Sequence, residues 1–233
     1  IEIYPVLDAI FKGIFGENPY KSPTDMGVNM AGNCIFDDEA CCYASRQEII
    51  RRYYTALCNL ADGKCEESEV NKLTLLMQQA KITPADRLVT VAANKRAEKS
   101  GLPAAAIELN DGTIITSETS DLLGTCAALV LNAIKHLAGI DHSVKLIPAA
   151  MIAPIQNMKV NYLQGNNPRL HTDEVLVALS MLSPNDENCK KALEQLPALK
   201  GCQVHTSVML SEVDRKIFKK LGVDLTSDPV KKR

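Results

Sequence analysis

Polar side chains concentrate in one short run near the start of the sequence, Ser22-Pro-Thr-Asp-Met-Gly-Val-Asn29. Two hydroxyls, a carboxylate and an amide around a glycine are groups that can hold a polar ligand. The candidate ligand-binding residues of this run are Ser22, Thr24, Asp25 and Asn29. A turn whose side chains hydrogen-bond to their own backbone uses the same residue types. The run therefore predicts either a binding loop or a self-satisfied turn.

A second group of candidate ligand-binding residues lies further along the chain: Thr119, Ser120, Asp121, Asn157 and His205. Predicted helices begin near Thr119 and shortly before Asn157, and a helix N-terminus offers unpaired N–H groups and about half a positive charge. Ligands of α/β sheets settle beyond the carboxyl ends of strands. The sequence therefore predicts an anion site built from Thr119, Ser120 and Asn157, with His205 nearby and Asp121 as a competing negative charge.

Metal-ligand patterns are weak, and we predict no metal site. Cys202 and His205 have the right types and spacing, but residues three apart on a strand point to opposite faces. The acidic run Asp37-Asp38-Glu39 could hold Mg²⁺, although an acidic turn before a helix uses the same residues. His142 and His171 are predicted loop residues with no partner nearby in the sequence.

Composition narrows the partners that the chain can have. Its 233 residues are 46% hydrophobic and 23% charged with a net charge of −2, which argues against binding nucleic acid or an anionic membrane surface. The longest apolar stretch, residues 122–134, falls short of the roughly 20 residues that span a bilayer. Eight cysteines without a C-x-x-C motif favour reduced thiols and a cytoplasmic location. The start, which lacks Met and a signal-type segment, is typical of a cut inside a longer polypeptide.

The first third of the sequence has helical periodicity. Ser45-Arg-Gln-Glu48 has the form of a capping box, and apolar residues follow it at helical spacing as far as Asp62-Gly63. Two further helices are predicted, over residues 70–80 and from Thr83-Pro84 to Ser100. Residues 21–39 have no periodicity and are predicted to form an ordered loop. A boundary is expected near Gly101, which makes residues 1–101 a helical subdomain.

Strands alternate with helices from residue 102 onward. Two short strands flank the turn Asn110-Asp111-Gly112, and a long apolar helix capped by residues 119–121 follows and ends at Gly139. A strand over 144–152, helices from Pro154 onward, a strand over 202–210, a helix capped by Ser211-Glu-Val-Asp214 and a final strand over 223–226 complete the pattern. This order predicts an α/β fold, α+β overall, in which residues 102–233 form a mixed-sheet sandwich.

The sandwich resembles the cytidine-deaminase-like fold over Pro103–Asp228, because the hairpin, the buried helix and the following strand have counterparts there. Zinc deaminases need a Glu two residues after the first ligand and a later pair of cysteines. Here Ala128 follows Cys126 at the Glu position, and Ile155 and Met158 occupy the two cysteine positions. The resemblance therefore implies this fold without its zinc site.

Several longer segments resemble a bacterial family of uncharacterised proteins, the domain-of-unknown-function family 1846. They include YKSPTDMGVN, ASRQEIIRRYY, TSDLLGTCAALVLNAIKHLAGI, PIQNMKVNYL and LGVDLTSDP. Members of that family are about twice as long, so the chain is similar to their C-terminal half. The resemblance implies that an N-terminal half of the same polypeptide is a partner. It also implies a phosphate-loop-like segment in that half, and so nucleotide or phosphate chemistry shared between the halves.

Two functions are compatible with these observations. The first is an enzyme, or half of one, that binds a nucleotide-like or phosphorylated small molecule. The second is a non-catalytic oligomerisation or regulatory domain, whose long apolar helices form an interface between copies of the chain. We expect a homo-oligomer in either case. Catalytic residues, cofactor, substrate and reaction stay open at this point.

Overall fold

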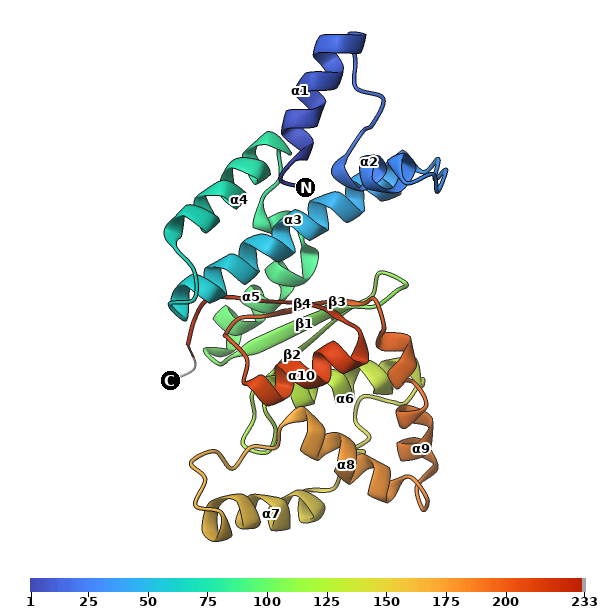
Figure 1. The fold of residues 1–233 in the computed structure, drawn as a ribbon. Coiled ribbons are helices and arrows are strands. Elements are labelled where there is room, and N and C mark those ends of the chain that lie inside the picture. The colour runs from blue at the N-terminus through green and yellow to red at the C-terminus, as the bar shows by residue number, and fades with distance from the viewer. Residues whose placement is uncertain (232–233) are drawn as a thin grey trace. The chain divides into compact units, whose positions relative to one another are not determined.

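A computed structural model describes residues 1–231 of the chain. The chain divides into two compact units, Ile1–Arg87 and Leu88–Arg233, which are coloured from blue through red in Figure 1. The sequence places the boundary near Gly101. The two boundaries differ by the helix α5 (Leu88–Ser100), which lies between them. Because α5 buries Val89 and Ala93 against Ala106 of the sheet, it belongs to the second unit.

The first unit is helical, as the periodicity predicts. It contains α1 (Tyr4–Phe15), α2 (Pro23–Met30), α3 (Asp38–Ala61), α4 (Glu67–Gln79) and the 3₁₀ turn η1 (Pro84–Asp86). Its apolar core is small: Ile49, Ile50 and Tyr54 of α3 pack with Met77 of α4 and with Ile82, which follows α4.

The polar run at residues 22–29 is helical, and the prediction of a loop over residues 21–39 is wrong there. Ser22 is the N-cap of α2, because its hydroxyl accepts a hydrogen bond from the Asp25 N–H at 3.1 Å, and Pro23 occupies the first turn. The next helix, α3, begins after Asp37, whose carboxylate accepts from the Ala40 N–H at 2.9 Å. Ser45 is therefore an interior residue of α3 and not its cap.

Within the described residues, a mixed four-stranded sheet forms the centre of the second unit. Its strands are β1 (Ala104–Glu108), β2 (Ile114–Glu118), β3 (Gln203–Thr206) and β4 (Asp224–Ser227), in the order β2-β1-β3-β4. The β1 strand is antiparallel to both neighbours, and β3 is parallel to β4. The turn at Asp111-Gly112 joins β1 to β2 with Gly112 at φ 83°, which confirms the predicted hairpin.

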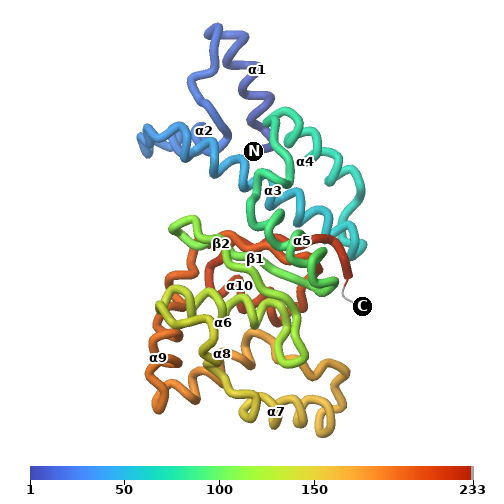
Figure 2. Tube along the Cα trace, turned by 180° about the vertical axis from the view of Figure 1, so that it is seen from behind, coloured from blue at the N-terminus to red at the C-terminus, as the bar shows by residue number. Residues whose placement is uncertain are grey.

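Helices cover both faces of the sheet (Figures 1 and 2). One face packs against α5, and the other packs against α6 (Thr125–Leu137) and α10 (Glu212–Leu221). Behind α6 lie α8 (Thr172–Leu182) and α9 (Glu187–Leu193), and the main core forms among these helices and the sheet.

The apolar helix α6 is mostly buried, as predicted, but it begins later than its sequence caps suggest. Leu170 explains the delay: its N–H donates to the Leu122 carbonyl and its own carbonyl accepts from the Gly124 N–H, both at 3.0 Å. These bonds keep residues 122–124 extended, so Gly124 becomes the N-cap. Among residues 1–231 no helix has both the length and the apolar character needed to cross a bilayer.

The strand predicted over residues 144–152 is absent, since this segment is a loop followed by α7 (Ala149–Asn157) and the π-helical turn η2 (Met158–Tyr162). Pro148 is the N-cap of α7, and the good helix formers Ala149, Ala150 and Met151 follow it. The sheet therefore lacks the strand expected after the buried helix. The chain is a mixed α/β protein, and the resemblance to a cytidine-deaminase-like fold is not supported.

Candidate functional site

A cavity of about 440 Å³ lies in the second unit, beyond the carboxyl end of β3. Its walls come from the start of α6, the loop before α8, and the segment that joins β3 to α10. The lining residues are Gly124, Thr125, Cys126, Asn166, Asn167, Arg169, Leu170, His171, Val208, Met209, Leu210, Ser211 and Asp214. This is the region of an α/β sheet in which ligands commonly bind.

Three helices begin at the cavity, and they differ in how their first N–H groups are used. His171 and Ser211, the N-caps of α8 and α10, both lie in local networks: the Glu174 carboxylate accepts from the His171 N–H at 2.7 Å, and the Ser211 hydroxyl accepts from the Asp214 N–H at 3.2 Å. The N-cap of α6 is Gly124, which provides no side-chain acceptor. The start of α6 is therefore the one of these three whose N-cap residue has no side chain.

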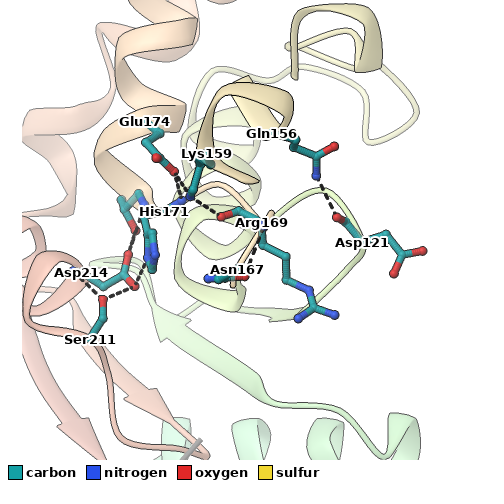
Figure 3. A network of polar contacts seen from close by, with 10 residues as sticks. Asp121, Gln156, Lys159, Asn167, Arg169, His171, Glu174, Ser211 and Asp214 are labelled. Atoms are coloured by element: carbon teal, nitrogen blue, oxygen red, sulfur yellow. Dashed lines mark hydrogen bonds and ion pairs between the residues drawn. The ribbon is translucent and has the colours of Figure 1, made fainter. Parts of the chain in front are cut away.

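Asp214 connects two of these helix starts (Figure 3). Its Oδ1 accepts hydrogen bonds from the Thr172 N–H at 3.1 Å and the Thr172 hydroxyl at 2.8 Å. Its Oδ2 accepts from the Ser211 hydroxyl at 2.9 Å and lies 3.1 Å from His171 Nδ1. One carboxylate thus holds the first turns of α8 and α10 together and fixes the imidazole ring.

The charges of this pair are set by their mutual contact. Burial acts to raise the pKa of Asp214, but hydrogen bonds from His171, Thr172 and Ser211 outweigh it and lower that pKa to about 2. The hydrogen bond to Asp214 raises the pKa of His171 above its usual value, and burial opposes this only in part. Asp214 is therefore ionised at neutral pH, and its contact with His171 stabilises the imidazolium relative to the neutral ring.

The loop before α8 brings a guanidinium to the cavity. Arg169 Nε donates to the Ser120 carbonyl at 2.7 Å. The position of Arg169 is also held from behind, because Lys159 Nζ donates to its carbonyl at 2.7 Å and pairs with the Glu174 carboxylate at 2.6 Å. Figure 3 shows the contacts of Lys159 with Arg169 and Glu174, which link η2 to the start of α8.

The residues predicted to form an anion site in this half lie at different distances from the cavity. Ser120 does not line the cavity, although its carbonyl accepts from Arg169, which does. The Asp121 carbonyl accepts from Gln156 Nε2 at 3.0 Å. Thr119 is buried just after β2. Asn157 lies at the C-terminal end of α7, where its side chain bonds to Asn161, and it does not line the cavity.

His205 lies on the face of the sheet opposite to α6. It is the register partner of Ala106, which packs against α5. The ring is fully buried, with Nδ1 2.9 Å from the Thr226 hydroxyl and Nε2 3.5 Å from the Asp228 carboxylate. This geometry is that of a hydrogen-bonded core network and not of a ligand-facing edge.

The candidate residues of the first unit bond to one another and to neighbouring groups. Asp25 Oδ1 accepts from Asn29 Nδ2 at 2.6 Å, and Asn29 Oδ1 accepts from the Ile35 N–H at 2.7 Å. The Ser45 hydroxyl donates to Thr24 Oγ1 at 2.7 Å. These contacts correspond to the self-satisfied alternative for residues 22–29.

Sequence reasoning missed the pair His171 and Asp214. Their side chains meet across 43 positions of sequence, and Asp214 has a sufficient local explanation as a first-turn acidic residue of α10. The only signal was a histidine placed directly before the Thr-Asp-Glu start of a predicted helix. Over residues 1–231 no group of three or more His, Cys, Asp or Glu side chains could hold a metal ion.

Two family models match the chain. Residues 1–81 match "Domain of unknown function DUF1846, N-terminal", and residues 85–233 match "Domain of unknown function DUF1846, C-terminal". The prediction that the chain corresponds only to the C-terminal half of such proteins is therefore corrected for residues 1–81.

Curated relatives are similar along nearly the whole chain. A UPF0371 protein of Corynebacterium diphtheriae is 51% identical over 229 residues, which are 98% of this chain and 46% of the relative. A UPF0371 protein of Streptococcus pyogenes serotype M5 is 48% identical over 99% of this chain and 47% of its own length. The chain thus spans about half the length of the curated relatives it matches.

Proposed function

The chain belongs to the DUF1846 family, and we propose that its second unit binds a small anionic molecule, of the phosphorylated or nucleotide-like class, in the cavity at the start of α6. One observation carries the proposal. The N-terminus of α6 has no side-chain cap and opens on a cavity that Arg169 and His171 also line. Helix N-termini of this kind attract phosphate, sulfate and carboxylate groups.

The balance of charge supports an anion. The α6 terminus supplies about half a positive charge, and Arg169 supplies a full one. The negative charge of Asp214 opposes them, but the Asp214 carboxylate is already in contact with His171 and accepts hydrogen bonds from three further donor groups. Leu170, Val208 and Leu210 give the cavity an apolar wall for the uncharged part of a ligand. A volume of about 440 Å³ is within the range of small-molecule sites, roughly 300–1,000 Å³.

Calorimetric titration of the chain with sulfate, inorganic phosphate and adenosine monophosphate, at constant ionic strength, tests the proposal. We expect saturable binding of one anion per chain. The variant Gly124→Asp places a carboxylate at the uncapped terminus and should abolish binding. The N-cap backbone of Gly124, with φ −66° and ψ 157°, accepts any residue, and an added Cβ would lie 3.4 Å from the Leu170 carbonyl.

Gly124→Ala is the matched control, because it adds the Cβ without the charge and should bind as the wild type does. Arg169→Met should weaken binding by roughly 10- to 100-fold, since hydrogen bonds to charged groups contribute about 1.5–3 kcal/mol. Equal affinity of the wild type and Gly124→Asp, or no binding of any of the three anions, would contradict the proposal.

A non-catalytic association domain is the second candidate, and a feature of α1 favours it. Val6, Ile10 and Ile14 recur every four residues and are 59%, 45% and 67% exposed, so they form an apolar stripe along one side of the helix. In this reading the stripe joins copies of the chain. Sedimentation of the wild type and of Ile10→Asp tests it: a concentration-dependent oligomer that the substitution dissociates supports association, and monomers in both contradict it.

A further inference from the structure

We propose that His171 is the proton-carrying residue of the cavity in the second unit, and that Asp214 is the residue that positions it. The substrate that the cavity would bind is an anionic molecule with a hydroxyl group. The inference rests on the proposed function in one respect, since the bound anion is the molecule that exchanges the proton with His171.

The orientation of the ring is the first argument. Asp214 Oδ2 lies 3.1 Å from His171 Nδ1, and that carboxylate is acceptor-only when ionised. Nδ1 therefore carries a hydrogen in both protonation states. In neutral His171 the lone pair is then on Nε2, the other nitrogen of a ring that lines the cavity.

The rigidity of the support is the second argument. Asp214 is held by the Thr172 N–H, the Thr172 hydroxyl and the Ser211 hydroxyl, so it cannot turn away from the ring without losing these bonds. The side chain of Asp214 is 12% exposed, whereas that of His171 is 27% exposed. The pair therefore has a shielded positioning group and an accessible ring, which is the arrangement of a general acid–base pair.

The step that this geometry allows is a single proton transfer. A hydroxyl group of the bound anion gives its proton to Nε2, the O–H bonding pair stays on the oxygen, and His171 becomes an imidazolium next to the Asp214 carboxylate. The reverse transfer returns the proton. Other charged groups near the ring are Glu174 and Lys159, which pair with each other, and Arg169, which lines the same cavity.

The surroundings of the ring include groups that favour the imidazolium and groups that favour the neutral imidazole. Asp214 stabilises the imidazolium and raises the pKa of His171, while burial and Lys159 act to lower it. A pKa near the working pH is the condition under which an imidazole exchanges protons efficiently.

The test is a pH titration of the full chain with ¹⁵N-labelled histidine, followed by imidazole NMR with and without sulfate, an anion that does not itself titrate in this range. We expect neutral His171 to carry its hydrogen on Nδ1, and its pKa to exceed the roughly 6.5 of a histidine in an unfolded chain. In Asp214→Asn the pKa of His171 should fall, because the carboxylate whose hydrogen bond and charge raise it is replaced by a neutral amide. The control is Glu174→Gln. It removes a charge that raises the pKa of His171 less than Asp214 does, and the glutamine oxygen can still accept from the His171 N–H. The pKa of His171 should therefore fall by much less in this variant.

Saturating sulfate should raise the pKa of His171 in the wild type, because the imidazolium and the anion share the cavity. An Nε2–H tautomer in neutral His171 overturns the inference even if sulfate binds, and the measurement on the wild type needs no variant that might fail to fold. A pKa that sulfate binding leaves unchanged overturns it as well. Absence of sulfate binding together with the Nδ1–H tautomer instead counts against the proposed function.

Discussion

The Thr172 hydroxyl donates a hydrogen bond of 2.8 Å to Asp214 Oδ1, although the two residues are 42 positions apart. Asp214 belongs to α10 but thereby satisfies the first turn of α8, whose N-cap His171 makes no side-chain cap bond. The starts of the two helices, and the cavity wall between them, therefore depend on one buried carboxylate.

Replacing this carboxylate should destabilise the second unit strongly. Asp214→Ala leaves the donors of Thr172 and the Nδ1–H of His171 without their acceptor, and we expect the free energy of unfolding to fall by about 2–4 kcal/mol. Urea denaturation at pH 7 measures this. Asp173→Ala is the control, because Asp173 is the neighbouring first-turn acidic residue of α8, whereas the hydrogen bonds to the Asp214 carboxylate come from His171, Thr172 and Ser211. A loss no larger than that of the control would contradict the assignment.

The same pair predicts a specific dependence of stability on pH. The pKa of Asp214 is about 2 in the folded chain, below the roughly 3.9 of an unfolded one, so its contribution of about 2 kcal/mol is present above pH 4 and lost as the pH falls toward 2. The pKa of His171 is raised, so its contribution is complete below pH 6.5 and lost as the pH rises through the folded value. Unfolding of the wild type and of Asp214→Asn between pH 2 and pH 9 should differ in both limbs. Parallel curves would refute this prediction.

The cysteines should differ widely in reactivity. Cys34 is exposed, whereas burial raises the pKa of Cys189 to about 11, and Cys41, Cys126 and Cys202 are also buried. Because the thiolate is the reactive form, a thiol reagent at pH 8 should label Cys34 rapidly and Cys189 only after unfolding. Peptide mapping over time checks the order, and a count under denaturing, non-reducing conditions should return eight thiols. Early labelling of Cys189, or a count of four or fewer, would contradict the prediction.

The sequence predicts elements well where their causes are local. The turn at Asp111-Gly112 needs only a residue that accepts positive φ, and the start of α10 needs only the Ser211 hydroxyl, so both are found as expected. Ser45 shows the limit of this reasoning. It has the pattern of a helix cap, but the Thr24 N–H and hydroxyl occupy its side chain, and α3 continues through it.

The candidate site was only partly predictable for the same reason. Helix N-termini beyond a strand end were expected, but their position depends on Leu170, which bonds to Leu122 and Gly124 and moves the start of α6 past Thr119 and Ser120. No local pattern contains that bond, and none joins His171 to Asp214. Both relationships arise only when α8 packs against α6 and α10.

The central claim is that an anion binds at the start of α6, and amide chemical-shift mapping of the full chain with sulfate tests it most directly. We predict saturable shifts at the amides of residues 124–127 and 169–172, with a single dissociation constant and with no comparable response in residues 22–29 or around His205. Saturable shifts confined to other parts of the chain, or none at sulfate concentrations up to 50-fold above the protein, would contradict the account.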